Sequence, residues 1–98
     1  MRRAPRCDRN HAEVVRALKQ AGVSVQSLAG IGFGCPDLIC GVNGKNILLE
    51  IKDGLAKPSE QTLTADEKVW HACWRGEVHV VKSADEALKI ILAARRES

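Results

Sequence analysis

The sequence predicts a single α/β domain, a central mixed sheet flanked by helices, with its elements in the order αβββαβα. Three segments carry the start and stop signals of helices, and four short apolar or alternating segments are typical of strands. The chain of 98 residues is long enough for one compact domain and too short for two. We expect this domain over residues 10–98, preceded by a basic flexible tail over residues 1–9.

The composition is that of an ordinary globular protein. Hydrophobic residues make up 45% of the chain and charged residues 28%, and no apolar run approaches the ~18 residues of a membrane-spanning helix. The basic N-terminus is not followed by an apolar stretch, so it does not resemble a secretory signal. We therefore expect a cytoplasmic protein with no membrane partner.

Four cysteines are present, and their spacing does not indicate a zinc site. None of them forms a CxxC pair, and no histidine lies at the spacing of a metal finger. Because thiols stay reduced in the cytosol, we interpret the cysteines mostly as small apolar packing residues. They are Cys7, Cys35, Cys40 and Cys73.

The first helix and strand are expected directly after the basic tail. Apolar residues recur at helical spacing over residues 11–21, after the candidate caps Asp8 and Asn10. Gly22 is a good helix terminator. Residues 23–28 alternate loosely between apolar and polar side chains, which predicts a strand.

A glycine-rich loop leads from this strand into a predicted hairpin. Three alternating glycines lie within residues 29–36, but their spacing does not match a nucleotide-binding loop and no GK[ST] follows. The apolar residues 37–42 and residues 45–52 are expected to pair as strands. Asn43-Gly44 between them is a strong signal for a tight hairpin turn.

The second half predicts a helix, a strand and a last helix. A polar loop over residues 53–63 leads to a helix ending near residue 74, and a valine-rich strand follows over residues 77–82. The last helix is expected to end near Ala94. Both helices open on the capping-box pattern S/T-x-x-E, formed by Thr64 with Glu67 and by Ser83 with Glu86.

Three charged residues are expected to meet at one end of the hairpin. Side chains alternate along a strand, so Glu50 and Lys52 share one face and Ile51 has the other. Counting outward from the turn, Asp37 lies opposite Glu50 to within about one residue. A bare E-x-K triplet is more often a surface salt bridge, but the Pro36-Asp37 pair after a glycine loop and the apolar hairpin favour a functional site.

Two carboxylates this close repel each other unless a cation lies between them. Mg²⁺ prefers oxygen ligands and keeps several waters, and the backbone carbonyl of Ile51 can add a ligand to those of Asp37 and Glu50. Lys52 beside the cation can position an attacking water and offset developing negative charge. These parts fit the metal-assisted hydrolysis of a phosphodiester bond.

These motifs resemble the signature of the PD-(D/E)xK nucleases. Pro36-Asp37 is followed, after twelve residues, by Glu50-Ile51-Lys52. The fuller strings GCPDL, LEIK and Leu63-Thr64 are similar to the VRR-NUC branch, over about residues 10–92. The resemblance implies a restriction-endonuclease-like αβββαβα core, dependence on Mg²⁺ or Mn²⁺, and action on DNA. Stand-alone members of this kind resemble Holliday-junction resolvases and commonly occur in phage genomes, which implies the cytoplasm of a bacterial or phage-infected cell.

The resemblance also implies an acidic residue from the first helix at the metal site, and Glu13 has the matching position. On its own pattern Glu13 flanks the apolar stripe of that helix, where a solvated surface charge would be the simpler interpretation. With the resemblance, we expect Glu13, Asp37, Glu50 and Lys52 to be catalytic. The expected metal ligands are Glu13, Asp37, Glu50 and the carbonyl of Ile51.

The helix after the E-x-K strand departs from the family pattern. Related nucleases often carry a glutamine there, four residues before an aromatic residue or a histidine, and this chain has Glu67 and His71. A carboxylate cannot donate a hydrogen bond as an amide can, so we assign Glu67 to helix capping and doubt any catalytic role for it. Trp70 is expected to pack in the core or a dimer interface and Trp74 in an interface, with base stacking as the alternative for both.

Basic residues give candidate contacts to the phosphates of DNA. The net charge is only +3, but arginines crowd both ends of the chain, where solvated tails are an equally good explanation. We predict contacts to the DNA backbone, which position a protein without specifying a sequence. The residues expected to make them are Arg9, Lys45, Lys57 and His71.

The expected function is that of a Mg²⁺- or Mn²⁺-dependent endodeoxyribonuclease that acts on branched DNA, in particular Holliday junctions. A homodimer would place two such sites about a twofold axis, which suits paired cuts. A flap or duplex nuclease, a catalytically silent DNA-binding module and an accessory subunit of a repair complex are the alternatives. We expect no small-molecule cofactor.

Overall fold

The computed structural model describes residues 10–96 and confirms the predicted fold class. The predicted tail over residues 1–9 lies outside the described residues. Three helices and a mixed four-stranded sheet follow one another in the order αβββαβα, with one 3₁₀ turn in the long loop. The elements are α1 (His11–Gln20), β1 (Ser24–Ser27), β2 (Leu38–Val42), β3 (Lys45–Ile51), η1 (Pro58–Glu60), α2 (Ala65–Cys73), β4 (Val78–Val81) and α3 (Ala84–Arg96).

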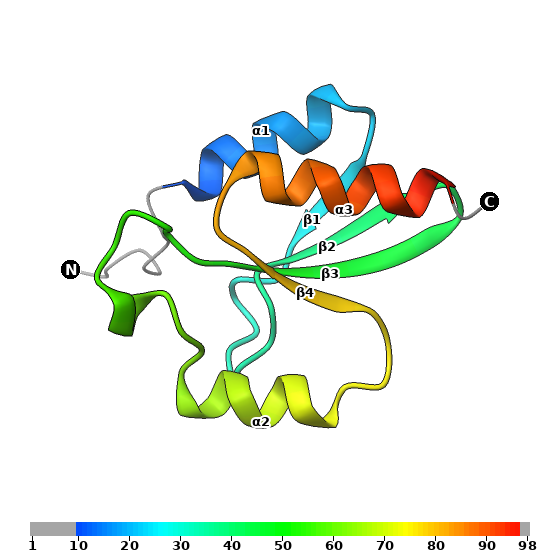
Figure 1. Ribbon diagram of the computed structural model, residues 1–98. Coiled ribbons are helices and arrows are strands. Elements are labelled where there is room, and N and C mark those ends of the chain that lie inside the picture. Colours follow the sequence, from blue (N-terminus) through cyan, green and yellow to red (C-terminus); the bar gives the residue numbers. More distant parts are fainter. Residues whose placement is uncertain (1–9, 97–98) are drawn as a thin grey trace.

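The sheet has the strand order β1-β2-β3-β4. The first two pairs are antiparallel, whereas β3 and β4 are parallel. Parallel neighbours need a long crossover, and the chain between β3 and β4 provides it with the long loop and α2. Figure 1 shows α1 and α3 on one face of the sheet and α2 on the other.

The β2–β3 hairpin has the register that the sequence predicts. Asn43 and Gly44 both have positive φ angles, 51° and 76°, as a two-residue hairpin turn with the twist of a sheet requires. The pairing of Leu38 with Leu49 continues outward and places Asp37 opposite Glu50. The turn therefore fixes which two carboxylates face each other about five residue pairs away.

The main apolar core lies between the sheet and the helices α1 and α3. Helices contribute small and branched residues to it, and the strands contribute alternate residues from one face. Cys40 is fully buried in this core, which confirms it as a packing residue, and burial raises the pKa of its thiol to about 11. The fully buried apolar side chains here include Val14, Leu18, Leu38, Cys40, Ile47, Leu49, Val81 and Ala87.

The predicted caps are confirmed for α2 and altered elsewhere. Thr64 Oγ1 accepts from the Glu67 N–H at 3.2 Å, and Glu67 Oε1 accepts from the Thr64 N–H at 2.9 Å, which completes a capping box. At α3, Ser83 Oγ accepts from the Glu86 N–H, but Glu86 Oε1 accepts from the Lys82 N–H, one residue earlier than in a capping box. That helix also runs two residues past the predicted end at residue 94.

Asn10 occupies the N-cap position of α1, but its side chain does not cap the helix. Its amide nitrogen donates to the carbonyl of Lys52 at 3.1 Å and to that of Lys82 at 2.8 Å. These bonds tie the start of α1 to the chain just beyond β3 and β4. Among residues 10–96, no helix has the length and apolar character needed to cross a bilayer.

Candidate active site

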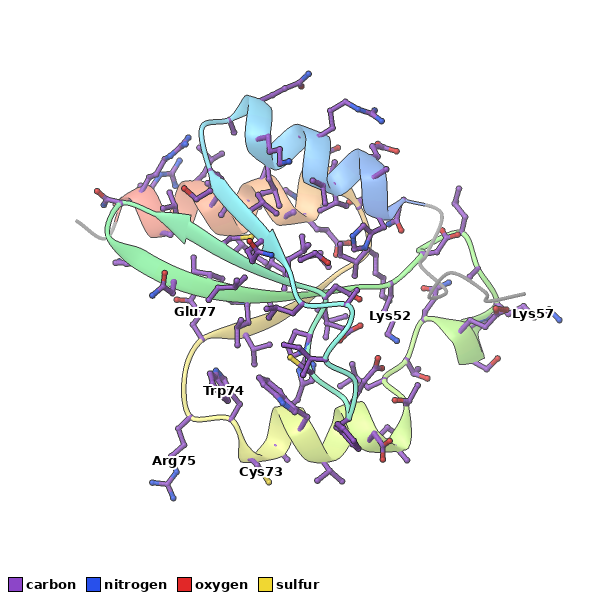
Figure 2. The ribbon with its side chains drawn as sticks, turned by 180° about the vertical axis from the view of Figure 1, so that it is seen from behind. Lys52, Lys57, Cys73, Trp74, Arg75 and Glu77 are labelled. Atoms are coloured by element: carbon purple, nitrogen blue, oxygen red, sulfur yellow. The ribbon has the colours of Figure 1, made fainter. Side chains whose placement is uncertain are left out.

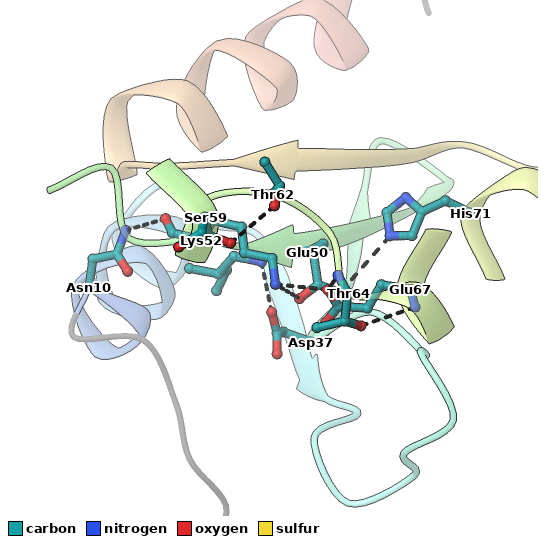
Figure 3. Close-up of polar contacts among 10 residues, drawn as sticks. Asn10, Asp37, Glu50, Lys52, Ser59, Thr62, Thr64, Glu67 and His71 are labelled. Carbon is teal, nitrogen blue, oxygen red and sulfur yellow. Dashed lines mark hydrogen bonds and ion pairs between the residues drawn. The ribbon is translucent and has the colours of Figure 1, made fainter. Parts of the chain in front are cut away.

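Five polar side chains gather where β3 ends, between the sheet and α2 (Figure 3). They come from three parts of the chain: the residue before β2, the end of β3 and the residue after it, and the first two turns of α2. Alternation along β3 sends Glu50 toward α2, while Ile47, Leu49 and Ile51 enter the main core. The five residues are Asp37, Glu50, Lys52, Glu67 and His71.

Asp37, directly before β2, accepts hydrogen bonds from residues on both sides of that strand. Its carbonyl accepts from the Leu28 N–H at 2.8 Å, so its backbone polar groups point toward the β1 side. Its side-chain Oδ2 accepts from the Ile51 N–H at 2.7 Å, on the other side. A carboxylate that accepts a backbone N–H is held in one orientation, here beside the side chain of Glu50.

The proline before this aspartate leaves a carbonyl without its cross-strand donor. The hairpin register, continued outward, pairs Pro36 with Ile51. Such a pair would exchange two backbone hydrogen bonds, but proline has no N–H to donate to the Ile51 carbonyl. The N–H and C=O of one strand residue point to the same side, so this carbonyl lies on the side of Asp37. The predicted third ligand therefore has a physical basis in the Pro-Asp pair.

Glu50 has a buried carboxyl group that is incompletely hydrogen-bonded. It is 3% exposed, and its Oε1 has no hydrogen-bond partner among the described residues. Burial raises the pKa of Glu50 to about 9, helped by the hydrogen bond and charge of Asp37 and by the charge of Glu67, while Lys52 opposes the rise. Without a cation, this carboxyl group therefore holds a proton near neutral pH.

Lys52 lies beside the two carboxylates but pairs with a third. Its Nζ is 2.8 Å from Glu67 Oε1 and 3.9 Å from Glu50 Oε2. Burial raises the pKa of Glu67, but hydrogen bonds from Lys52 and the Thr64 N–H and the charge of Lys52 outweigh it, so the pKa is lowered overall. The capping role expected for Glu67 is confirmed, and the structure adds its pairing with Lys52, which the sequence reasoning missed.

His71 lies inside the site. Its side chain is 14% exposed, and Nε2 is 4.0 Å from Glu50 Oε1. Neither of these two atoms has a hydrogen-bond partner among residues 10–96. Burial lowers the pKa of His71, the nearby Glu67 opposes this, and the charge of Lys52 adds to it. Its i+4 spacing from Glu67 on α2 was the sequence signal that these two residues share a face.

The other predicted site residues lie apart from this cluster. Glu13 is exposed on α1 and lines a separate hollow of about 430 Å³, whose lining includes neither Asp37 nor Glu50. Lys45 begins β3, at the turn end of the hairpin. Lys57 is exposed in the long loop and points outward, as Figure 2 shows. Arg9 lies outside the described residues.

The thiol of Cys35 is in the electrostatic field of the same carboxylates. Burial raises its pKa, and the negative charges of Glu50 and Asp37 raise it further. The sequence reasoning treated this cysteine only as a packing residue. Its place directly before Pro36-Asp37 was the signal that it would lie near the site.

The donor set fits a hard divalent cation held by few protein ligands. Among residues 10–96, no group of three or more His, Cys, Asp or Glu side chains is arranged to hold a metal ion. Mg²⁺ requires less, because it commonly binds through one or two carboxylates and keeps its waters. The unpartnered Oε1 of Glu50, the adjacent carboxylate of Asp37 and the carbonyl of Ile51 are the oxygen atoms that such an ion would use.

Comparisons of the chain with models of protein families, with curated proteins and with solved structures found no match. The motif resemblance and the geometry of the site are therefore the two grounds for a functional assignment.

Proposed function

We propose that this protein is a divalent-metal-dependent endodeoxyribonuclease whose centre is formed by Asp37, Glu50 and Lys52. The observation that carries the proposal is the buried carboxyl group of Glu50, which has an unpartnered oxygen and lies beside Asp37. A pair of this kind stabilises a fold poorly, because burial and mutual repulsion both oppose ionisation. Perturbed carboxyl groups of this kind are common where a site performs chemistry.

We assign metal binding and the positioning of the reacting groups to different residues. Asp37, Glu50 and the carbonyl of Ile51 would hold Mg²⁺ or Mn²⁺, which supplies charge stabilisation to the phosphodiester and makes water more acidic. The ammonium group of Lys52 donates hydrogen bonds to the attacking water or to a non-bridging phosphate oxygen. Its positive charge also offsets the negative charge that develops as the leaving group departs.

Glu67 is proposed as the positioning residue for Lys52. Its carboxylate accepts from Nζ at 2.8 Å and from the N–H of the N-cap residue Thr64, so the ammonium group is fixed relative to α2. The pairing gives the buried ammonium group of Lys52 a carboxylate partner. His71, with its lowered pKa, is neutral near pH 7 and offers either a donor or an acceptor at the edge of the site.

DNA, in particular branched DNA, is proposed as the substrate on the strength of the VRR-NUC resemblance. A homodimer would present two such centres to the two strands of a junction. The resemblance also proposes Glu13 as a further acidic group, and Lys45, Lys57, Arg9 and His71 as contacts to DNA. Glu13 makes no hydrogen bond or ion pair with Asp37 or Glu50 within the described residues, so any role it has requires bound metal or DNA.

Cleavage of a substrate panel tests the proposal. Purified protein is incubated with four-way junctions, flaps and plain duplex, in Mg²⁺, Mn²⁺ or EDTA. We expect metal-dependent cutting, with Asp37→Asn, Glu50→Gln and Lys52→Ala each lowering the rate by at least about 100-fold. Leu92→Ala, an exposed residue of α3, is the matched control. Wild-type protein that binds these DNAs without cutting any of them would instead indicate the catalytically silent module.

A further inference from the structure

A large apolar side chain projects from the glycine loop beside the site. Phe33, the single phenylalanine of the chain, is 90% exposed. Its backbone has a φ of 58°, in the left-handed region that residues with side chains rarely adopt. The exposed ring contributes almost nothing to folding and the backbone strain opposes it, and strain of this kind is concentrated at functional sites.

The backbone that carries Phe33 is held close to α2. Gly32 and Gly34, on either side of Phe33, have φ angles of 76° and 83°. A Cβ atom on Gly34 would lie 2.4 Å from the carbonyl oxygen of Asp66, so only glycine allows the loop to pack this closely on the first turn of α2. The backbone of the loop is therefore held against the helix that also supplies Glu67 and His71 to the site, and the ring projects from it.

An aromatic groove continues from Phe33 along α2. A hollow of about 450 Å³ is lined by six residues, of which three are aromatic. The rings of Trp70 and Trp74 are stacked, with centroids 4.6 Å apart and planes 18° apart. Trp74 is 47% exposed, and Figure 2 shows it at the end of α2 beside Arg75. The lining residues are Phe33, Asp66, Val69, Trp70, Cys73 and Trp74.

The groove begins only a short length of chain from the proposed catalytic centre. Phe33 and Asp37 are four residues apart, so their backbones lie within about 14 Å of each other. Stacked nucleotides advance about 3.4 Å each along a strand. A base that contacts Phe33 is thus no more than about four nucleotides from a phosphate held at Asp37 and Glu50.

We propose that Phe33 and the groove beside it stack against an unpaired DNA base within about four nucleotides of the scissile phosphate. The inference rests on the proposed function and names the feature of the substrate that the site selects. Aromatic side chains stack on any base, because every base has a π face, and apolar wedges enter DNA where stacking is interrupted. Branch points provide such bases, whereas continuous duplex keeps its bases stacked inside.

Shape and charge favour a base over a second copy of the chain as the occupant. The ring projects singly from the tip of a clamped loop, which suits insertion better than a broad, flat contact. Arg75, exposed just after α2, can meet a phosphate beside a stacked base.

Binding measurements on flap DNA in EDTA test the stacking without cleavage. An abasic residue is moved through the four nucleotides on each side of the branch point. At one position we expect it to weaken wild-type binding by about 5- to 100-fold, the effect of losing one base–aromatic stack. Phe33→Ala is expected to weaken binding of the intact flap equally and to be insensitive to the abasic residue, whereas Phe33→Trp restores both properties. Leu92→Ala is the control and should behave as wild type.

Three results would overturn the stacking role. One is an abasic effect that persists undiminished in Phe33→Ala, and another is no abasic effect at any position in the wild type. The third is a change of Phe33→Ala from dimer to monomer in solution, which would make the groove a contact between copies. If the wild type shows the abasic effect but cuts no DNA, only the nuclease proposal is refuted. If it cuts DNA but shows no abasic effect, only the stacking role is refuted. An unchanged midpoint of urea unfolding for Phe33→Ala shows that the variant is folded.

Discussion

Lys52 Nζ lies 2.8 Å from Glu67 Oε1, and the same Glu67 oxygen accepts the N–H of Thr64 at the start of α2. One carboxylate thus joins the charge beside the proposed catalytic centre to the cap of the helix that covers it. A capping role is available to many acidic residues, but few of them also fix a buried ammonium group. The position of Lys52 is therefore coupled to the position of α2.

Two variants separate these roles of Glu67. Thr64→Ala removes only the cap, and we expect it to lower the free energy of unfolding by about 1 kcal/mol with little change in cleavage rate. Glu67→Ala should lower stability at least as much, and should also lower the cleavage rate by about tenfold or more, because Lys52 loses its anchor. Urea unfolding and initial rates measure the two effects. Equal rate losses in both variants would show that Glu67 acts only through the helix.

The buried carboxyl group of Glu50 gives the metal-free protein a distinctive pH dependence. Burial and the neighbouring Asp37 raise its pKa to about 9, above the 4.5 of an exposed glutamate. Between these values the folded state binds more protons than the unfolded state, so stability is greatest below pH 4.5 as far as Glu50 is concerned, and falls as the pH rises toward 9.

The measurement is urea unfolding in EDTA from pH 5 to pH 9. We expect the contribution of Glu50 to decline by at most about 1.4 kcal/mol per pH unit. Glu50→Gln, which stays neutral throughout, should show a flatter profile across the same range. A profile that is the same for both proteins would mean that Glu50 is ionised in the folded, metal-free state.

Pro36 is predicted to favour metal binding because it has no N–H to donate to the carbonyl of Ile51. Pro36→Ala introduces an N–H opposite the carbonyl of Ile51, which would then be used in the sheet. We expect Mn²⁺ to bind at least about threefold more weakly, measured by calorimetry. The side chain of Pro36 is buried, so the variant should also lose stability, and Val42→Ala, buried near the far end of the hairpin, controls for that loss. Equal Mn²⁺ affinities for Pro36→Ala and the control would exclude the Ile51 carbonyl as a ligand.

The thiols should differ in reactivity. Cys40 is fully buried with a pKa of about 11, whereas Cys73 is exposed at the end of α2. The experiment uses a Cys7→Ser background and a disulfide reagent at pH 8. We expect rapid modification of Cys73, and modification of Cys40 only on unfolding. Cys35 should react more slowly than Cys73, because the pKa of the Cys35 thiol is raised. Peptide mapping of the modified protein identifies the sites. Rapid modification of Cys40 in the folded protein would contradict the described core.

The hairpin and its charges could be predicted because their geometry is local. The Asn43-Gly44 turn fixes the register, and a slip of one residue would place the apolar residues on the wrong face. This is why the pairing of Asp37 with Glu50 follows from counting alone. The helical spacing of apolar residues likewise predicted the fold class, since an amphipathic helix buries its apolar face against the sheet.

The features that the sequence did not reveal depend on how distant segments dock. Asn10 is a plausible cap by type, but once α1 lies on the sheet its Nδ2 donates to the carbonyls of Lys52 and Lys82, and its Oδ1 does not accept from the first turn of α1. The pairing of Lys52 with Glu67 and the burial of His71 depend on the path of the long loop, which no periodicity describes. Propensity and spacing specify elements, whereas these contacts are set by tertiary packing.

Calorimetric titration of the metal-free protein with Mn²⁺ near pH 7.5, in two buffers of different ionisation enthalpy, tests the central claim most directly. We predict one site per chain and a release of protons on binding, because Glu50 must ionise to act as a ligand. Asp37→Asn should abolish the binding, while Leu92→Ala should leave it unchanged. Wild-type protein that binds no Mn²⁺, or binds it equally well as Asp37→Asn, would contradict the assignment of this buried carboxylate pair as a metal centre.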